Sequence, residues 1–515
     1  MNHKNKETNG VSETDLLTKE LDVNLAELRR LLGASPDIVI REFIIGPAKN
    51  YRAVLLYMEN LADISRIHED ILQPIADGFA GITTSSRSIF SSLRTDLLIV
   101  SDIHVERSFT RTIGRILTGD TAFFAEGLNE AWVFNTSNRP HRAVGIPETE
   151  ISIRGPRESF VEPIATNAAL LRRRISHSDL TYETVTIGRK TRTKVYIAYL
   201  KGVVNEKVVE EIRKRLTRIE NDGILGAGYI EQLISDAPSS LFSTISYSER
   251  PDVVAAKILE GRAAILIDGT PEVLTAPALF IESFQSSDDY NFHPLYATLI
   301  RWIRYIAFGI SILGPAFYIA LSSFNQELIP TPLFITLAAG NEGTPYPTFV
   351  EVIIMGLLFE IFREAGIRLP RPFGQGLTFV LALIMAQAAI SIGLAGVATV
   401  AVVAVTAIAS LIVPGQSNAS IIIRLALAIL ASFFGMYGIL LGVLVMLAHL
   451  VSLRSFGVPY LAPIAPFNPR DFRKDVIWRA PLWAMLIRPR TIGWRNPRRQ
   501  GNQRKPAPPE DDSGS

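Results

Sequence analysis

Short apolar runs, separated by turn residues and charged residues, make up the first 290 positions of the chain. Leucines at helical spacing predict a helix over residues 21–32, and two β-rich runs with a turn between them predict strands over 38–45 and 51–58. Helices and strands alternate in this region, which indicates an α/β class. The same pattern predicts further helices over 62–75, 158–175 and 206–219 and further strands over 194–200 and 263–267.

The pattern changes near residue 298, where the apolar stretches become long. Residues 372–423 and 425–453 contain no Asp, Glu, Lys or Arg, and His449 is the only histidine in the second stretch. A water-soluble domain must solvate its surface, so it does not leave such long stretches uncharged. A spanning helix needs about 20 predominantly apolar residues. The stretches that approach this length are 299–321, 346–367, 376–394, 397–413 and 421–453, whereas 331–339 is too short.

The placement of Lys and Arg predicts an orientation. Arg301 and Arg304 lie at the start of the first span, the loop 325–347 contains no Lys or Arg, and residues 454–505 are rich in both. This distribution places both ends of the membrane region in the cytoplasm, which requires an even number of spans.

Five candidate spans conflict with that requirement. Either residues 346–367 are amphipathic and do not cross fully, which leaves four spans, or the last segment is divided within residues 435–442, which gives six. We favour four spans as the working hypothesis. It leaves four arginines on the wrong side of the membrane, namely Arg363, Arg368, Arg371 and Arg424.

These patterns predict an α/β soluble region of two subdomains, followed by an all-α transmembrane domain with four to six segments. The N-terminus lacks the apolar core of a signal peptide, which favours a cytoplasmic soluble half. The predicted regions are a disordered lead-in over 1–20, a first α/β subdomain over 21–150, a second over 151–297, a helical transmembrane domain over 298–453, and a basic cytoplasmic tail over 454–515 that is disordered at its end.

Composition and motifs offer few candidate residues for catalysis. The chain has no cysteine, its 7 histidines are scattered, and it has no GxxxxGK[ST] phosphate loop. Asp268-Gly269-Thr270 follows an apolar run, as in aspartyl-phosphate hydrolases, but Leu266 occupies the position of their nucleophile. A strand-ending turn is therefore the favoured interpretation. We expect no enzyme activity, no cofactor and no metal site.

The charge distribution argues against nucleic acid as a partner. The formal net charge of +2 averages two unlike halves, and the soluble half is not broadly basic. The run Arg172-Arg173-Arg174 lies on a predicted helix, where a solvated face or a structural salt bridge is favoured over nucleic-acid binding. We therefore expect no nucleic-acid partner.

Two polar side chains stand out in the uncharged region. Gln387 and Ser391 are four residues apart, so they share one face of a helix rich in small residues. Such a face either lines a water-filled path between several copies or hydrogen-bonds a neighbouring helix, and physics alone favours the two equally. Glu360 is likewise either a cation-attracting group near the mouth of a path or part of an ion pair in the membrane region.

Several motifs follow one another in order between about residues 150 and 490. They are GPRESFVE at 155–162 with Asn167 and LRRRI at 171–175, ERPD at 249–252 with Gly261-Arg262 and DGTP at 268–271, QSSDDY at 285–290, FEIFREAGIRLPR at 359–371, and SLRSFGVPY at 452–460. This series resembles the A subunits of GerA-type spore germination receptors. Residues 1–150 show no diagnostic match. Within the motifs, the resemblance implies a structural or gating role for Arg363, Glu364, Arg454, Asp288 and Asp289. The motif that contains Arg363 and Glu364 also contains Glu360.

The resemblance implies a multi-pass, non-enzymatic protein of the spore inner membrane. Such A subunits work with a transporter-like B subunit, which binds the nutrient, and with a lipoprotein C subunit. The resemblance also implies a homo-oligomeric ring in the lipid bilayer that conducts monovalent cations when the nutrient binds. The alternative within the family is an amplifier of ion release without its own nutrient-binding partner. A secondary transporter is less favoured because the predicted spans show no internal repeat, and a membrane-tethered enzyme because the soluble half has no catalytic constellation.

Overall fold

The structure is a computed structural model that describes residues 15–33, 35–45, 51–59, 61–78, 103–137, 145, 147, 149–150, 152–341, 343–368, 371–489, 491–492, 496–499 and 501. These residues form two compact units. The described residues within 1–236, 245–277 and 486–504 form the first unit, and those within 237–244 and 278–485 form the second. The predicted disorder at residues 1–14 and 502–515 lies outside the described residues.

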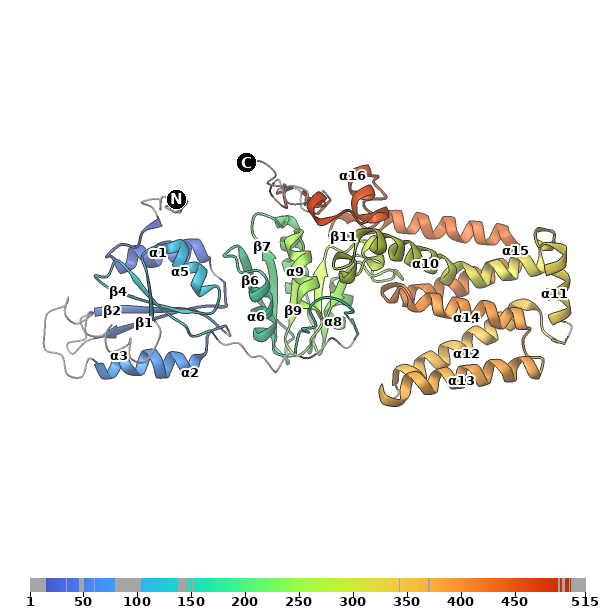
Figure 1. Ribbon diagram of the computed structural model, residues 1–515, viewed down its shortest axis with the longest axis horizontal. Coiled ribbons are helices and arrows are strands. Elements are labelled where there is room, and N and C mark those ends of the chain that lie inside the picture. The colour runs from blue at the N-terminus through green and yellow to red at the C-terminus, as the bar shows by residue number, and fades with distance from the viewer. Residues whose placement is uncertain are drawn as a thin grey trace, which may run out of the picture. The chain divides into compact units, whose positions relative to one another are not determined.

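The first sheet has five strands in the order β1-β2-β4-β5-β3, all antiparallel. Leucines three or four residues apart on α1 pack on one face together with α5, and the segment α2–η2–α3 covers the other face (Figure 1). Leu17, from the predicted disordered lead-in, is also buried on the α1 face. The elements are α1 (Leu21–Leu32), β1 (Ile38–Ile45), β2 (Tyr51–Met58), α2 (Ile64–Arg66), η2 (Ile67–Leu72), α3 (Gln73–Gly78), β3 (Ile103–Glu106), α5 (Phe109–Ile116), β4 (Thr121–Ala125) and β5 (Ala131–Phe134).

The second sheet repeats this topology, with five antiparallel strands in the order β6-β7-β9-β10-β8. Helices α6 and α9 pack against one face through a continuous apolar core, while α7 and α8 pack against β6 and β10. The elements are α6 (Ile164–Arg174), β6 (Leu180–Ile187), β7 (Thr193–Leu200), α7 (Glu206–Thr217), α8 (Ala227–Ile234), β8 (Ser246–Ser248), α9 (Pro251–Leu259), β9 (Ala263–Ile267) and β10 (Val273–Ala276).

These elements confirm the mixed helix and strand character predicted for the soluble region. The predicted strands over 38–45, 51–58 and 263–267 are present with the same bounds. The helix predicted over 158–175 begins only at Ile164, because Pro163 before it has an extended backbone. Both sheets are antiparallel, which the alternation of helices and strands did not reveal.

The second unit is mainly helical. Two of its helical segments, Pro294–Ser323 and Pro414–Ser452, are long and apolar enough to cross a membrane, and they expose many large apolar side chains. The helix α11, which covers the stretch predicted to be too short to span, is one of the shorter apolar helices. The α-helices of this region are α10 (Pro294–Ser323), α11 (Thr331–Asn341), α12 (Thr348–Arg368), α13 (Arg371–Ser391), α14 (Val397–Leu411) and α15 (Ser417–Ser452).

Helix α15 is not continuous. Gly435 has φ 57° and ψ −137°, which is not helical and favours glycine. The chain reverses there, so that Gly438 lies against Leu430 and Gly442 against Leu427, residues that a straight helix would hold far apart. The last apolar segment is therefore a helical hairpin, divided within the range 435–442 that the six-span alternative requires.

The beginning of α10 and the end of α15 lie at the same end of this unit. Ala278 N–H donates to Ser455 Oγ at 3.0 Å, and Phe280 N–H donates to the Tyr460 carbonyl oxygen at 2.9 Å. These bonds join the segment before α10 to the segment that follows α15, which includes β11 (Arg454–Ser455) and β12 (Val458–Pro459).

Candidate functional site: a buried ion network beside helix α10

A short 3-10 helix, η4 (Ser287–Tyr290), positions Asp289 just before α10. The preceding Ser286 caps it, because its hydroxyl accepts a hydrogen bond from Asp288 N–H at 3.3 Å. In return, Asp289 Oδ2 accepts a bond from Ser286 N–H at 3.3 Å. This reciprocal cap holds the Asp289 carboxylate in one orientation, and Asp288 is buried beside it.

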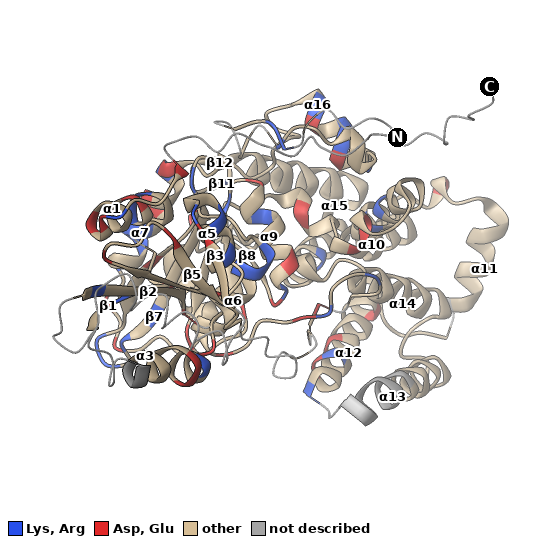
Figure 2. Ribbon diagram, turned by 60° about the vertical axis from the view of Figure 1, so that its left-hand side comes forward, with Lys and Arg blue, Asp and Glu red and all other residues tan. Residues whose placement is uncertain are grey.

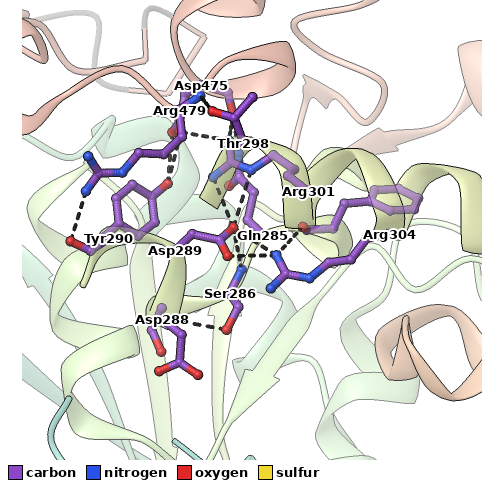
Figure 3. Close-up of polar contacts among 12 residues, drawn as sticks. Gln285, Ser286, Asp288, Asp289, Tyr290, Thr298, Arg301, Arg304, Asp475 and Arg479 are labelled. Carbon is purple, nitrogen blue, oxygen red and sulfur yellow. Dashed lines mark hydrogen bonds and ion pairs between the residues drawn. The ribbon is translucent and has the colours of Figure 1, made fainter. Parts of the chain in front are cut away.

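The Asp289 carboxylate is held by two arginines of α10 (Figure 3). Arg301 donates to Oδ2 from Nε at 3.3 Å and from Nη2 at 3.2 Å, and Arg304 donates from Nη1 at 2.8 Å. Asp289 is 1% exposed and Arg301 is 0% exposed. Burial of a charge is costly unless an opposite charge and hydrogen bonds compensate it, and here both are present.

Asp475 reaches the same arginine from the C-terminal segment η7 (Phe472–Ile477). Arg301 Nη1 donates to Asp475 Oδ1 at 3.1 Å and also contacts the Asp475 carbonyl oxygen. The Tyr290 hydroxyl donates to Asp475 Oδ2 at 2.9 Å. Arg301 therefore bridges two carboxylates that lie 186 positions apart in the sequence, Asp289 and Asp475 (475 − 289 = 186).

Further hydrogen bonds attach the C-terminal segment to α10. Tyr305 donates to the Val476 carbonyl at 2.9 Å, and Trp302 donates to the Ile477 carbonyl at 2.8 Å. The Arg479 guanidinium lies 5.5 Å from the centre of the Tyr290 ring, and burial lowers the pKa of this arginine below its ordinary value. The site is thus a junction that fixes the C-terminal segment to α10.

This junction consists of ion pairs and hydrogen bonds. Its carboxylates are held by arginines, and within the described part of the chain no group of three or more His, Cys, Asp or Glu is placed to hold a metal ion. The η4 segment, α10 and the C-terminal segment share the same charged groups, so the junction holds these three segments together.

Sequence reasoning found only part of this junction. It selected Asp288 and Asp289 from the motif before the first span, and it used Arg301 and Arg304 only to orient the membrane region. Asp475 was missed. A usable signal was present, because Asp471 and Asp475 are the only acidic residues between positions 454 and 505, in an otherwise basic tail.

A second charged group lies among the helices of the same unit. Glu360 of α12 pairs with Arg363 at 2.9 Å and with Arg424 of α15 at 2.5 Å. Glu364 instead pairs with Arg368 on an exposed face of α12, at 2.6 Å. Figure 2 shows both signs of charge on α12, whereas long stretches of the other helices of this region are uncharged. This geometry matches the ion-pair interpretation of Glu360, and its predicted pore role stays a prediction.

Gln387 and Ser391 lie on α13 and are both exposed in the single chain. Ser391 donates its hydroxyl hydrogen to the Gln387 carbonyl oxygen of the same helix at 2.8 Å. Helix α13 packs against α12 and α14, but within the described residues the Gln387 side-chain amide makes no hydrogen bond to them. Arg454, the remaining motif residue, is exposed on β11. The predicted pore-lining role of these side chains also stays a prediction.

Two motif segments of the soluble region have structural explanations. Asp268 Oδ1 accepts a hydrogen bond from Ile164 N–H at 3.1 Å, so it caps α6 from the turn after β9. Arg172 is 1% exposed and donates to Asp37 from Nε at 3.1 Å and from Nη2 at 2.8 Å. The strand-ending turn and the structural salt bridge are thus the interpretations that fit the described structure.

Comparison with known proteins extends the similarity over nearly the whole chain. The family profile described as "Bacillus/Clostridium GerA spore germination protein" matches residues 26–491. Spore germination protein KA of Bacillus subtilis (strain 168) is 39% identical over 495 residues, which are 96% of this chain and 90% of that protein. The uncharacterized membrane protein YfkQ of the same organism is 36% identical over 498 residues, which are 96% of this chain and 94% of that protein.

A solved structure is also similar. The crystal structure of the N-terminal domain of the A subunit of the Bacillus megaterium spore germinant receptor GerK3 is 36% identical, with a TM-score of 0.41, over 52% of this chain and 97% of that domain. The motifs from residue 155 to residue 460 lie within the profile match, as do both sheets and the α10 junction. The chain therefore belongs to the GerA family of spore germination proteins.

Proposed function

We propose that this chain is the A subunit of a germinant receptor in the spore inner membrane, and that several copies surround a path for monovalent cations. The observation that carries the channel part is the environment of Gln387. Its amide is exposed on a helix whose other side chains from residue 380 to residue 390 are apolar, and it has no hydrogen-bond partner within the described residues. A polar group facing lipid without a partner is unfavourable. Contact with a water-filled path, formed when copies assemble, removes that cost.

The proposed arrangement has six crossings. The start of α10 and the end of α15 lie at the same end of the unit, which favours an even number. The reversal at Gly435 supplies the sixth segment, and compensation of Glu360 by Arg363 and Arg424 lowers the cost of taking α12 through the bilayer. This scheme replaces the four-span hypothesis and keeps the soluble region and the C-terminal tail in the cytoplasm.

The test is the release of monovalent cations from spores after nutrient addition. A change of about 1.4 kcal/mol in a barrier changes a rate tenfold, and we expect Gln387→Leu or Ser391→Leu to alter cation release by at least about that factor. Ser432→Leu on α15 is a matched control, because the Ser432 hydroxyl also bonds a carbonyl of its own helix. Release at the normal rate, from spores with normal amounts of the Gln387→Leu and Ser391→Leu proteins, would remove α13 from the path.

Partner proteins distinguish the receptor from the amplifier subgroup. We propose a non-enzymatic role with a transporter-like B subunit and a lipoprotein C subunit, by extension from the family. Affinity purification of the tagged chain from spore membranes should recover both partners in amounts comparable to that of the chain itself. Recovery of the chain without either partner, with cation release retained, would favour an amplifier of ion release.

A further inference from the structure

An apolar cavity of about 220 Å³ lies among helices α10, α12, α14 and α15. Its polar lining groups are few: the Thr406 hydroxyl, which already donates to the Val402 carbonyl at 2.8 Å, and the paired side chains of Glu360 and Arg424. An engineered apolar cavity of about 150 Å³ stays dry and binds small apolar molecules. The aliphatic lining includes Pro315, Val352, Leu357, Val403, Ala407 and Ala428.

One end of the cavity carries a net positive charge. Two guanidinium groups, those of Arg363 and Arg424, share the single carboxylate of Glu360. The Arg363 Nε and the Glu360 Oε2 are both buried, and neither has a hydrogen-bond partner among the residues that the structure describes. Buried donors of this kind usually have a partner, from the protein or from a bound molecule. Because two guanidinium groups face one carboxylate, the net charge of this end is complementary to an anion.

The direction of the cavity also fits an amphiphile. Arg424 lies seven residues after Ser417, the first residue of α15, which at 1.5 Å per residue is about 10 Å into the helix. Gln416, just before Ser417, donates to Ser283 in the segment that leads into α10. The charged end thus faces the end of the unit where α10 begins, and the apolar walls extend from it toward Val352 near the opposite end of α12.

We propose that this cavity binds part of one acyl chain of an anionic phospholipid, with the lipid phosphate held by Arg424 and Arg363. Basic groups between membrane helices on the cytoplasmic side are suited to anionic headgroups, and arginine binds phosphate through several donors at once. The lipid would pack between α12 and α15 and would stabilise the helical region. This inference requires the helices to lie in a bilayer, but it does not require the cation path.

The experiment titrates the purified full-length chain in detergent with phosphatidylglycerol or phosphatidylcholine and follows bound lipid by native mass spectrometry. We expect phosphatidylglycerol to bind at least about tenfold more tightly. Arg424→Gln should remove most of this preference, because one charge-assisted contact is worth about tenfold in affinity. Glu360→Gln should increase the preference, because it removes the compensating negative charge. The opposite directions separate lipid recognition from general misfolding.

Two glycines give a matched test of the apolar part. A Cβ added at Gly356 or at Gly309 would meet nothing within 4 Å, but only Gly356 lines the cavity. We expect Gly356→Leu to weaken phosphatidylglycerol binding on the order of tenfold and Gly309→Leu to leave it unchanged. Equal affinity for the two lipids, or unchanged binding by Gly356→Leu, overturns the proposal. A changed oligomeric state of Gly356→Leu with unchanged lipid binding would assign the cavity to a second copy of the chain.

Discussion

Asp289 is almost completely buried, and it keeps its place because Arg301 and Arg304 surround its carboxylate. Arg301 is buried as well, and it depends on Asp289 and Asp475 in the same way. Replacing such a group by hydrophobic residues of the same volume is often harmless, whereas removing one partner leaves a buried charge without compensation. The network is therefore sensitive to single substitutions and makes the C-terminal segment depend on residues before α10.

We expect Asp289→Asn to destabilise the protein by about 3–5 kcal/mol, the usual cost of breaking a buried ion pair. The apparent melting temperature of the full chain in detergent should fall, and protease should cleave more readily near Asp475. Glu327→Gln is the control, because Glu327 is an exposed carboxylate of the same unit. If Asp289→Asn leaves both measurements equal to those of the control, the network does not hold the C-terminal segment.

Helices α12 and α14 are joined by one carboxylate. Glu351 of α12 is 1% exposed and accepts hydrogen bonds from Gly396 N–H at 2.9 Å and from the Thr399 hydroxyl at 2.8 Å. Gly396 is the N-cap of α14, so the carboxylate lies where unpaired N–H groups and the helix dipole favour a negative charge. The Glu351 carboxylate therefore joins α12 to α14 through hydrogen bonds.

Glu351→Gln keeps the size of the side chain and one acceptor oxygen but removes the charge. We expect it to lower the stability of the helical region by about 1–2 kcal/mol, the upper part of the range for a charge at a helix end. Glu364→Gln on the same helix is the control, because the exposed pair of Glu364 with Arg368 contributes little. Thermal unfolding of the full chain in one detergent compares the two variants. Equal melting temperatures of the two variants would contradict the proposal that Glu351 stabilises the contact between α12 and α14.

At the scale of the whole molecule, the soluble part is built twice on one plan. Both sheets place their strands in the order first, second, fourth, fifth, third, counted along the chain. In both, the helix before the first strand and the helix between the third and fourth strands share one apolar core, α1 with α5 and α6 with α9. The described chain thus contains a structural repeat in its soluble region.

The number of crossings gives a prediction for the full chain in membranes. With six crossings, an N-terminal tag and a C-terminal tag should both be cleaved by protease added to inverted vesicles, because the cytoplasmic side of the membrane faces outward in such vesicles. A tag inserted in the 325–347 loop should be protected and serves as the control. Protection of the C-terminal tag alone would require an odd number of crossings and would exclude the arrangement.

Local patterns predicted the elements well where one short-range cause determines them. Spaced leucines gave α1 its bounds, and β-rich runs gave β1, β2 and β9 theirs. Long uncharged stretches located the helices of the second unit, because the cost of placing charge in lipid acts on every residue of a span. The sequence also identified Asp288, Asp289 and Glu360 as positions of interest, through their motifs.

Partners of these residues lie far away in the sequence, and only the tertiary structure decided them. Asp475 meets Arg301, and Arg424 meets Glu360, because folding brings distant segments together, and neither local propensity nor periodicity contains that information. The reversal at Gly435 is similar, since glycine permits such a backbone but does not require it. The sequence by itself therefore determined the bounds of several helices and strands and the segments suited to a membrane, and the tertiary structure decided the remaining elements of the two sheets and which charges compensate one another.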